Sequence, residues 1–328
     1  MEDRSLGNQK LSIGIPIYNE QENLEEIVNR ILDAMNKYQI TNYELVFADN
    51  CSTDKSIQKL NELRNTLNIE IKIVKHARNY GYQTSLQTCL KYSDGDYVAI
   101  MDGDLQDPPE LLPIMLNELL KQQKNIIYGK RISRAGGILN RFFYKLYYRI
   151  WQKLADFEIQ VDSGEFAIYD RFSVNQILKF KEKNRFQRGI RAYLGLNQIE
   201  YPYRREIRHK GKTKFKFSQQ IQLGLDGIYS FSFAPIRMMM IIGLNVTFFS
   251  FVLSLISVVL KIINFYNESF NVGQMGKGLV QIFLIFTMLL GIIIIMLGII
   301  GEYLGRIYDE IRDRPIVIES INGEKINE

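Results

Sequence analysis

The chain has 328 residues, of which 46% are hydrophobic and 23% are charged, so one large domain or two modest ones are expected. Its two cysteines are too few for a disulfide framework and favour a reducing compartment. The net charge of +5 has a local origin, because basic residues gather just before an apolar region, at Arg204, Arg205, Arg208, Lys210, Lys212, Lys214 and Lys216. Phosphate groups of a nucleotide or of lipid headgroups suit such a run, and nucleic acid is a further alternative.

Strand-like and helix-like segments alternate along the N-terminal part of the chain. Apolar runs predict strands at 11–17, 44–49, 69–74 and 97–101. Apolar residues at helical spacing predict helices at 24–35, near 55–66 and near 83–92. Asn19, with Glu22 three residues on, resembles a pair that caps the first helix. This alternation with short connections predicts an α/β fold, with a mostly parallel sheet covered on both faces.

Polar side chains follow four of the predicted strands, at residues 18–20, 49–50, 78–79 and 102–104. In an open α/β sheet, ligands lie at the carboxyl ends of the strands. We therefore expect these four loops to line one crevice.

The acidic stretch 102–110 reads Asp-Gly-Asp-Leu-Gln-Asp-Pro-Pro-Glu, directly after a predicted strand that its paired prolines cannot continue. Asp102 and Asp104 are two residues apart and can direct oxygen atoms at one hard cation. Such a cation usually takes further ligands from water and from substrate phosphates. Taken alone, the stretch also fits an acidic turn before a helix, with Pro109 at the first helical position and Glu110 in the first turn.

Other kinds of site find little support in the sequence. Gly211, Lys212 and Thr213 resemble the tail of a phosphate-binding P-loop, but Glu206 stands where that loop requires glycine. No Gly-x-Gly-x-x-Gly follows a strand, and no cysteine and histidine cluster has zinc spacing. His76 is interpreted as a loop or packing residue rather than a catalyst.

The order of the motifs resembles a known family. Residues 12–20, 49–54 and 102–110 are similar to the signatures of family 2 glycosyltransferases with the GT-A fold. Residues 188–190, 211–215, 226–232 and 301–306 narrow the resemblance to membrane-anchored polyprenyl-phosphate glycosyltransferases, related to dolichol-phosphate mannose synthase and the bactoprenol glucosyltransferases. The resemblance extends from about residue 11 to 315 and implies a Rossmann-like catalytic domain with a mostly parallel sheet.

The resemblance implies that Asp102, Asp104 and Gln106 hold Mg2+ or Mn2+ against the diphosphate of the donor. A polyprenyl phosphate acceptor is already anionic near neutral pH, so its oxygen can attack without a strong general base. We expect a single displacement with inversion at the anomeric carbon. Asp162 and Glu165 are further candidate catalytic carboxylates, which could orient a sugar hydroxyl or the acceptor, or cap a turn.

The resemblance also implies that the donor lies against three loops and a basic arm. The base would be bound by Asp49, where this chain has Asp-Asn-Cys-Ser at 49–52 and the family more often has Asp-Asp-Gly-Ser. The candidate substrate-binding residues are Pro16, Tyr18 and Glu20 beside the nucleotide, Asp49 at the base, Arg205, Arg208 and Lys214 on the arm, and Arg78, Arg131 and Arg188.

The apolar segments 238–260 and 279–300 carry no charged residue and predict a two-helix transmembrane hairpin, since about 20 residues cover the hydrocarbon core. A buried core hairpin is the alternative. Positive residues are more frequent before and after the two predicted spans than in the segment that connects them, 261–278. Because positive residues mark the cytoplasmic side, both termini are expected in the cytosol. Rings and cations mix in 140–154 and aromatic residues are frequent in 216–236, which favours helices at headgroup level, with a core helix as the alternative for 140–154.

We therefore expect a cytosolic GT-A domain at 1–215, an interfacial segment at 216–237, a transmembrane pair at 238–301 and a cytosolic tail at 302–328. The predicted function is metal-dependent, inverting transfer of a sugar from a UDP- or GDP-linked donor to a polyprenyl phosphate of the undecaprenyl type. It would occur at the cytosolic face of the cell (inner) membrane, in the synthesis of cell envelope polysaccharide. A processive polysaccharide synthase and a non-catalytic membrane scaffold or lipid-binding protein are the alternatives. The bilayer is an expected partner and nucleic acid is not, and the hairpin offers a surface for a homo-oligomer.

Overall fold

The computed structural model describes residues 9–132, 163–183, 185–206 and 275–312, with shorter stretches between 236 and 259 and between 315 and 325. The chain forms two compact units, one comprising 1–230 with 314–328 and the other 231–313. Several predictions lie outside the described residues: the segment 140–154, nearly all of 216–237, and the side chains of Asp162, Arg208 and Lys214.

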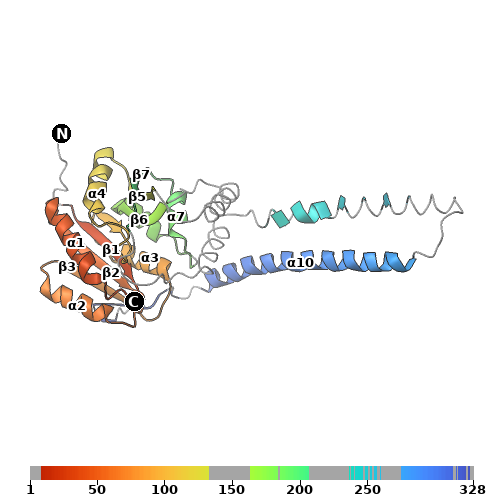
Figure 1. Ribbon diagram of the computed structural model, residues 1–328, viewed down its shortest axis with the longest axis horizontal. Coiled ribbons are helices and arrows are strands. Elements are labelled where there is room, and N and C mark those ends of the chain that lie inside the picture. Colours follow the sequence, from red (N-terminus) through yellow and green to blue (C-terminus); the bar gives the residue numbers. More distant parts are fainter. Residues whose placement is uncertain are drawn as a thin grey trace. The chain divides into compact units, whose positions relative to one another are not determined.

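One mixed sheet forms the middle of the first unit (Figure 1). Among the described residues its strands are in the order β7-β5-β6-β4-β1-β2-β3-β8-β9. Their bounds are β1 Leu11–Ile17, β2 Tyr43–Asp49, β3 Glu70–His76, β4 Tyr97–Ile100, β5 Ile126–Arg131, β6 Ser163–Asp170, β7 Gln198–Tyr203, β8 Glu319–Ile321 and β9 Glu324–Lys325. The central strands β4, β1, β2 and β3 are parallel, whereas β6 and β8 extend them on either side with antiparallel pairing. The predicted α/β fold is confirmed.

The described helices of this unit are α1 Leu24–Lys37, α2 Ser56–Thr66, α3 Tyr82–Tyr92, α4 Leu111–Gln122, α6 Arg171–Leu178 and α7 Gln187–Tyr193. The first three agree with the predicted helices within two residues. The predicted cap is wrong, because α1 starts at Leu24 and the Asn19 side chain instead accepts a hydrogen bond from the backbone N of Thr53 at 2.7 Å. Asn19 therefore joins two loops rather than capping a helix.

Alternation along β1 shows how helices cover both faces of the sheet. Ile13 and Ile15 are fully buried in one core cluster with the apolar stripe of α1. Gly14 points to the other face, where a Cβ atom would lie 2.7 Å from Cβ of Cys89 on α3. Because α3 approaches the backbone of β1 this closely, glycine is required at position 14.

The C-terminal residues return to this sheet. Within the predicted tail 302–328, residues up to Ile311 belong to a long helix, and β8 pairs antiparallel with β3, placing Glu319 opposite His76. The backbone N of Ala77 donates to the carbonyl of Ile318 at 2.8 Å, which extends this pairing beyond the strand. The edge of β3 is thereby covered by chain that follows the apolar region.

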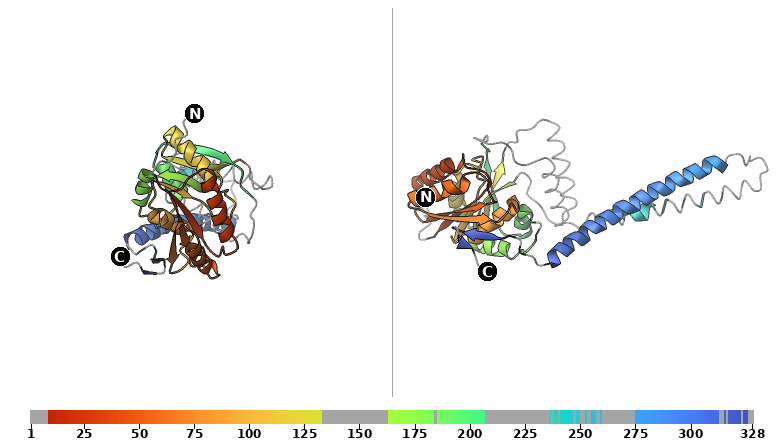
Figure 2. Two further views of the ribbon diagram at one scale, coloured as in Figure 1. Left: turned by 90° about the vertical axis from the view of Figure 1, so that its left-hand side faces the viewer. Right: turned by 90° about the horizontal axis from the view of Figure 1, so that it is seen from below.

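The second unit contains the long helix α10, Met275–Ile311, of 37 residues (Figure 2). The predicted span 279–300 lies within it. Among the described residues, Met288–Ile311 is the helix segment that is long and apolar enough to cross a membrane. Its apolar side chains are exposed, with Ile294 and Leu297 each at 61%. The described positions between 236 and 259 are also helical, where the first span, 238–260, is predicted.

Candidate functional site

The acidic turn that follows β4 packs directly against the end of β1. The backbone N of Met101 donates to the carbonyl of Gly14 at 3.1 Å, which continues the parallel pairing of β1 with β4. A Cβ atom at Gly103 would lie 3.1 Å from Cγ2 of Ile17 and 3.2 Å from the carbonyl oxygen of Pro16. Glycine at 103 therefore lets the two aspartates of the turn lie beside Pro16, a predicted substrate-binding residue.

Arg205 brings the carboxylates of this turn together. Its Nη2 atom lies 3.0 Å from Oδ2 of Asp102 and 3.9 Å from Oδ2 of Asp104. Its Nε atom lies 3.4 Å from Oδ1 of Asp107. One positive group is thus surrounded by three carboxylates, and three of the predicted site residues meet at the carboxyl end of β4.

Asp102 is the most perturbed of these carboxyl groups. Burial and the neighbouring charges of Asp107 and Asp104 raise the pKa of Asp102 to about 7, against the opposing effect of Arg205. Crowded acids of this kind bind a cation strongly, because a positive charge relieves their mutual repulsion. The donor set consists of oxygen atoms, which Mg2+ and Mn2+ prefer, so these residues fit a hard divalent cation.

Tyr82 and Asp107 are site residues to which no role was assigned from the sequence. The hydroxyl of Tyr82, the first residue of α3, donates a hydrogen bond to Oδ1 of Asp102. Burial and the charges of Asp102 and Glu165 raise the pKa of Tyr82 well above its ordinary value, so its hydroxyl stays a donor. Asp107 is 1% exposed and accepts from the hydroxyl of Tyr203 at 2.5 Å. The signal for Tyr82 was its place at the end of a crevice loop.

Gln106, the third predicted metal ligand, is held by the segment that carries Arg205. Its side-chain Nε2 donates to the backbone carbonyl of Glu206 at 3.4 Å. The backbone carbonyl of Gln106 accepts from the backbone N of Glu206 at 2.9 Å. The guanidinium of Arg30 makes paired hydrogen bonds with the carboxylates of both Glu206 and Glu110. These contacts fix the residue next to Arg205 against α1 and the start of α4.

Glu165 and Arg188 form an ion pair, with Nε of Arg188 3.0 Å from Oε1 of Glu165. The Glu165 side chain is only 3% exposed, and its Oε2 atom is buried without a hydrogen-bond partner among the described residues. Arg131, at the end of β5, belongs instead with the acidic turn: burial lowers its pKa, but the charges of Asp107 and Asp102 and a hydrogen bond with Tyr203 raise the pKa overall. Two predicted site residues, Glu165 and Arg188, therefore meet at the start of β6.

The loops after β1 and β2 are joined to each other. Asp49 is fully buried, and both its oxygen atoms accept from the backbone N of Ser52, at 3.2 and 3.1 Å. Burial raises the pKa of Asp49. The hydroxyl of Ser52 in turn accepts from the backbone N of Asn19 at 2.8 Å. Asp49 thus shapes its own loop, and its role toward the base stays a prediction.

The remaining predicted residues lie around these loops. Tyr18 is half-buried directly after β1. The Glu20 carboxylate accepts from Nδ2 of Asn23 at 2.7 Å. Arg78 is exposed, and its guanidinium carbon lies 4.5 Å from the centre of the Tyr80 ring. None of these contacts brings the three side chains to the acidic turn among the described residues.

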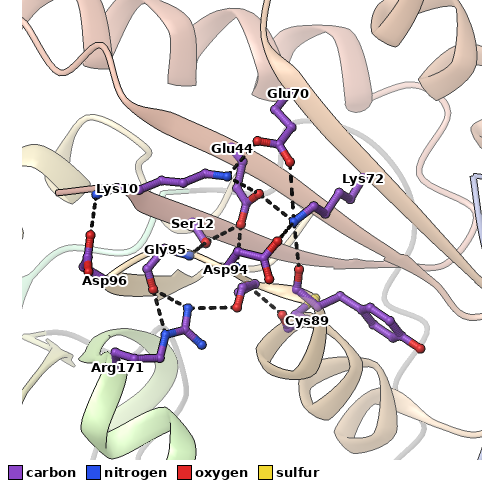
Figure 3. Close-up of polar contacts among 12 residues, drawn as sticks. Lys10, Ser12, Glu44, Glu70, Lys72, Cys89, Asp94, Gly95, Asp96 and Arg171 are labelled. Atoms are coloured by element: carbon purple, nitrogen blue, oxygen red, sulfur yellow. Dashed lines mark hydrogen bonds and ion pairs between the residues drawn. The ribbon is translucent and has the colours of Figure 1, made fainter. Parts of the chain in front are cut away.

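A second acidic cluster lies at the opposite end of the strands (Figure 3). Ligand atoms of Glu44, Glu70 and Asp94 lie within 4.8 Å of one another, near the amino ends of β2, β3 and β4. Lys10 and Lys72 each lie within 2.8 Å of the buried carboxylate of Glu44. Because Lys10 and Lys72 form ion pairs with all three carboxylates, we interpret the cluster as a structural ion-pair network rather than a metal site.

The sheet and the acidic turn fit an α/β transferase, and comparison with known proteins defines the family. Residues 12–178 match the model of glycosyl transferase family 2. The chain belongs to this family, and it is a glycosyltransferase with the GT-A type of fold.

Three similar proteins illustrate the relationship. The uncharacterized glycosyltransferase YkcC of Bacillus subtilis is 34% identical over 94% of this chain and 92% of its own length. The undecaprenyl-phosphate 4-deoxy-4-formamido-L-arabinose transferase of Proteus mirabilis is 26% identical over 96% of this chain and 95% of its own. The solved mannosyltransferase PcManGT of Pyrobaculum calidifontis, in complex with GDP-Man and Mn2+, is 20% identical, with a TM-score of 0.45 over 62% of this chain and 58% of its own.

Proposed function

We propose that the protein transfers a sugar from a nucleotide sugar to a polyprenyl phosphate at the membrane surface, with a divalent cation seated between Asp102 and Asp104. The observation that carries the proposal is that both carboxylates approach the same Nη2 atom of Arg205. A position that accommodates one guanidinium charge between two aspartates suits a compact cation equally well. Asp102, Asp104 and the amide oxygen of Gln106 would hold it.

Bound Mg2+ or Mn2+ would neutralise the diphosphate that leaves the sugar. The guanidinium of Arg205 would then face that diphosphate, because its planar fork matches two phosphate oxygens. The hydroxyl of Tyr82 keeps Asp102 oriented toward the same point. The Glu165–Arg188 pair stands nearby and is suited to orient a sugar hydroxyl or the acceptor phosphate.

The acceptor proposal rests on two observations. The relative from Proteus mirabilis is named an undecaprenyl-phosphate transferase, and it aligns with nearly the whole of this chain. The exposed apolar surface of α10 matches an enzyme whose acceptor is anchored in a bilayer. A phosphate acceptor needs little help from a general base, so a single displacement with inversion is expected.

The pairing of β8 with β3 supports a two-span arrangement. Both strands belong to one sheet, so residues before and after the apolar region lie on the same side of any membrane. A chain that leaves and returns to one side crosses an even number of times. If α10 provides one crossing, the helical positions between 236 and 259 would provide the other. The basic residues that flank the apolar region support a cytosolic location of this side, at an inner membrane.

The test uses the full-length protein in nanodiscs that contain a polyprenyl phosphate. Radiolabelled UDP- and GDP-sugars are added one at a time, with Mn2+ or with a chelator. Metal-dependent formation of a single-sugar lipid product is the expected result, with the opposite anomeric configuration to that of the donor by NMR. Long polymer would instead identify a processive synthase, and no transfer from any donor would favour a non-catalytic membrane protein.

A further inference from the structure

The strand β8 and the residue after it, Asn322, bind the edge of the sheet and the neighbouring helix α3. The backbone of β8 pairs with the last three residues of β3, and the Asn322 side chain accepts from the backbone N of Ile73 at 3.0 Å. The Glu319 carboxylate contacts α3, where its Oε1 atom lies 2.7 Å from Nζ of Lys91 and 2.5 Å from the hydroxyl of Tyr92. The side chain of Glu319 is 6% exposed, whereas that of Lys91 is 43% exposed.

A chain of polar contacts leads from Glu319 into the sheet. Oε2 of Glu319 lies 3.4 Å from Oγ1 of Thr88, and this oxygen lies 2.9 Å from Nε2 of His76. His76 is fully buried at the end of β3, and its Nδ1 atom lies 3.3 Å from Oδ1 of Asn50. His76 takes no part in the proposed chemistry. Both nitrogen atoms of its ring have polar partners, which makes full burial of the ring possible.

The direction of these hydrogen bonds follows from Asn50. Its Oδ1 atom also accepts from the backbone N of Tyr80 at 2.9 Å, so Oδ1 is the carbonyl oxygen and Nδ1 of His76 must donate to it. Burial lowers the pKa of His76 and keeps the ring neutral, so Nε2 accepts from the hydroxyl of Thr88. The single proton of that hydroxyl is then used, so Glu319 acts on Thr88 by holding α3, which carries it, through Lys91 and Tyr92.

Asn50 also ties together the loops that leave β2 and β3. Its Nδ2 atom donates to Oδ1 of Asn79 at 2.9 Å, and the same Oδ1 accepts from the backbone N of Gly81 at 3.0 Å. An aspartate at position 50 could not make the bond to Asn79, because an ionised carboxylate only accepts. The position of the loops after β2 and β3 therefore depends on the ring of His76, and on Thr88, which holds that ring.

We propose that β8 is part of the donor-binding site, and that Glu319 is a positioning residue that holds α3, and with it Thr88, against His76 and Asn50. This inference rests on the proposed function, because the resemblance places the base of the donor at Asp49, beside Asn50. The C-terminal strand then sets the spacing of the two loops that receive the nucleotide. Its loss weakens donor binding while the chemistry at Asp102 and Asp104 proceeds at its own rate.

The first experiment measures the effect of nucleotide on the wild-type protein. Amide hydrogen exchange is followed in the full-length chain in detergent micelles, with and without UDP or GDP in the presence of Mn2+. Because coupling between two sites is reciprocal, nucleotide slows exchange in 318–325 as well as in 77–81. Protection of 77–81 with unchanged exchange in 318–325 would overturn the inference and leave the proposed function standing.

The second experiment compares variants by isothermal titration with UDP or GDP and by steady-state kinetics. Thr88→Val and Glu319→Ala are expected to raise the nucleotide Kd and the donor KM by about tenfold, with kcat at saturating donor nearly unchanged. Thr88→Ser, which keeps the hydroxyl, restores binding. Ser320→Ala, on the same strand, is the matched control with wild-type binding.

The results for these variants distinguish the role of β8 from the proposed function. Wild-type binding in both Thr88→Val and Glu319→Ala, alongside lost binding in Asp49→Ala, would refute the role of β8 alone. A kcat that falls together with the affinity would also refute it, because a general loss of structure has that effect. A wild-type protein that binds no nucleotide and transfers no sugar would instead refute the proposed function.

Discussion

The guanidinium of Arg205 donates to Oδ2 of Asp102 at 3.0 Å, at the carboxyl end of β4. A positive side chain thus stands where the donor's cation is proposed to bind. In the protein without donor, Arg205 pairs with the aspartates. When the donor is bound, we expect Arg205 to pair with the diphosphate instead. The two roles predict opposite effects of removing it.

Arg205→Ala is expected to strengthen binding of Mn2+ in the absence of nucleotide, because the competing charge has gone. In the presence of nucleotide sugar it is expected to raise the donor KM by about tenfold or more, since a charge-assisted bond to phosphate is lost. Titration calorimetry with Mn2+ alone and steady-state kinetics measure the two effects. Arg204→Ala, at an exposed neighbouring position, is the control. Weaker binding of Mn2+ alone in Arg205→Ala would contradict this picture.

Asp104→Ala is expected to abolish sugar transfer while membrane insertion persists. The side chain is 11% exposed and supplies one of the three carboxylates around Arg205 and one of the proposed ligands of the cation. Transfer is assayed in nanodiscs, and Mn2+ binding is measured in parallel. Asp33→Ala removes an exposed carboxylate on α1 and should behave as wild type. Near-normal turnover in Asp104→Ala would mean that the cation lies elsewhere.

Gly103→Ala tests the close approach of the acidic turn to β1. The new methyl group would meet Ile17 at 3.1 Å and the carbonyl of Pro16 at 3.2 Å, so the turn must shift by a few tenths of an ångström. Overpacking of this kind costs about 1 to 3 kcal/mol. We expect a moderate fall in Tm and a larger loss of transfer activity. If the loss of activity is fully explained by the lower stability, then the position of the acidic turn does not control transfer.

Cys51→Gly is expected to stabilise the protein. Cys51 has a φ of 63°, a left-handed conformation that costs a residue with a Cβ atom about 1 to 2 kcal/mol. Glycine removes that cost but loses more entropy on folding, which leaves a gain of about 0.5 to 1 kcal/mol. Thermal unfolding in detergent measures the change. Cys51→Ala keeps the conformational cost, so an equal rise in Tm for both variants would contradict the explanation.

The network around Glu44 predicts a pH dependence of stability. Burial opposes ionisation of Glu44, but hydrogen bonds from Lys10, Lys72 and Ser12 outweigh it and lower the pKa to about 2. The carboxylate therefore stabilises the fold fully above its unfolded pKa of about 4.5, and this contribution is lost as the pH falls toward 2. Its size is about 3 kcal/mol, from 1.36 kcal/mol for each unit of pKa.

Glu44→Gln should accordingly lower the Tm at pH 7, and the difference from wild type should shrink between pH 4.5 and the acid limit of the folded protein. Thermal unfolding across that range supplies the measurement. Glu62→Gln, on the exposed side of α2, is the control. A difference in Tm that does not change with pH would show that lost packing, rather than charge, accounts for the effect.

Much of the parallel core could be predicted, because its signals are local. The apolar run at 11–17 coincides with β1, and the stripe from Leu24 to Met35 lies on the buried face of α1. The acidic turn after β4 was found from its position and its residue types. Arg205 was expected to grip phosphate, but its place among the aspartates depends on contacts of Glu206 with Arg30, which lies 176 residues away in the sequence.

The C-terminal strand could not be predicted in the same way. Residues 319–321 read Glu-Ser-Ile, which is too short for a strand pattern, and their structure arises from pairing with the distant strand β3. Tyr82 likewise reaches Asp102 through the packing of α3, which no spacing in the sequence reveals. In both cases the missing information was a long-range contact between elements.

The position of β8 in the chain has a consequence for biosynthesis. A ribosome releases residues 319–325 only after α10 has been made, so the nascent catalytic sheet stays incomplete until the apolar segment has left the ribosome. An unfinished chain therefore exposes the outer edge of β3 and lacks the contacts of Glu319 with α3. Completion of the domain in this way follows synthesis of the segment that is proposed to enter the membrane.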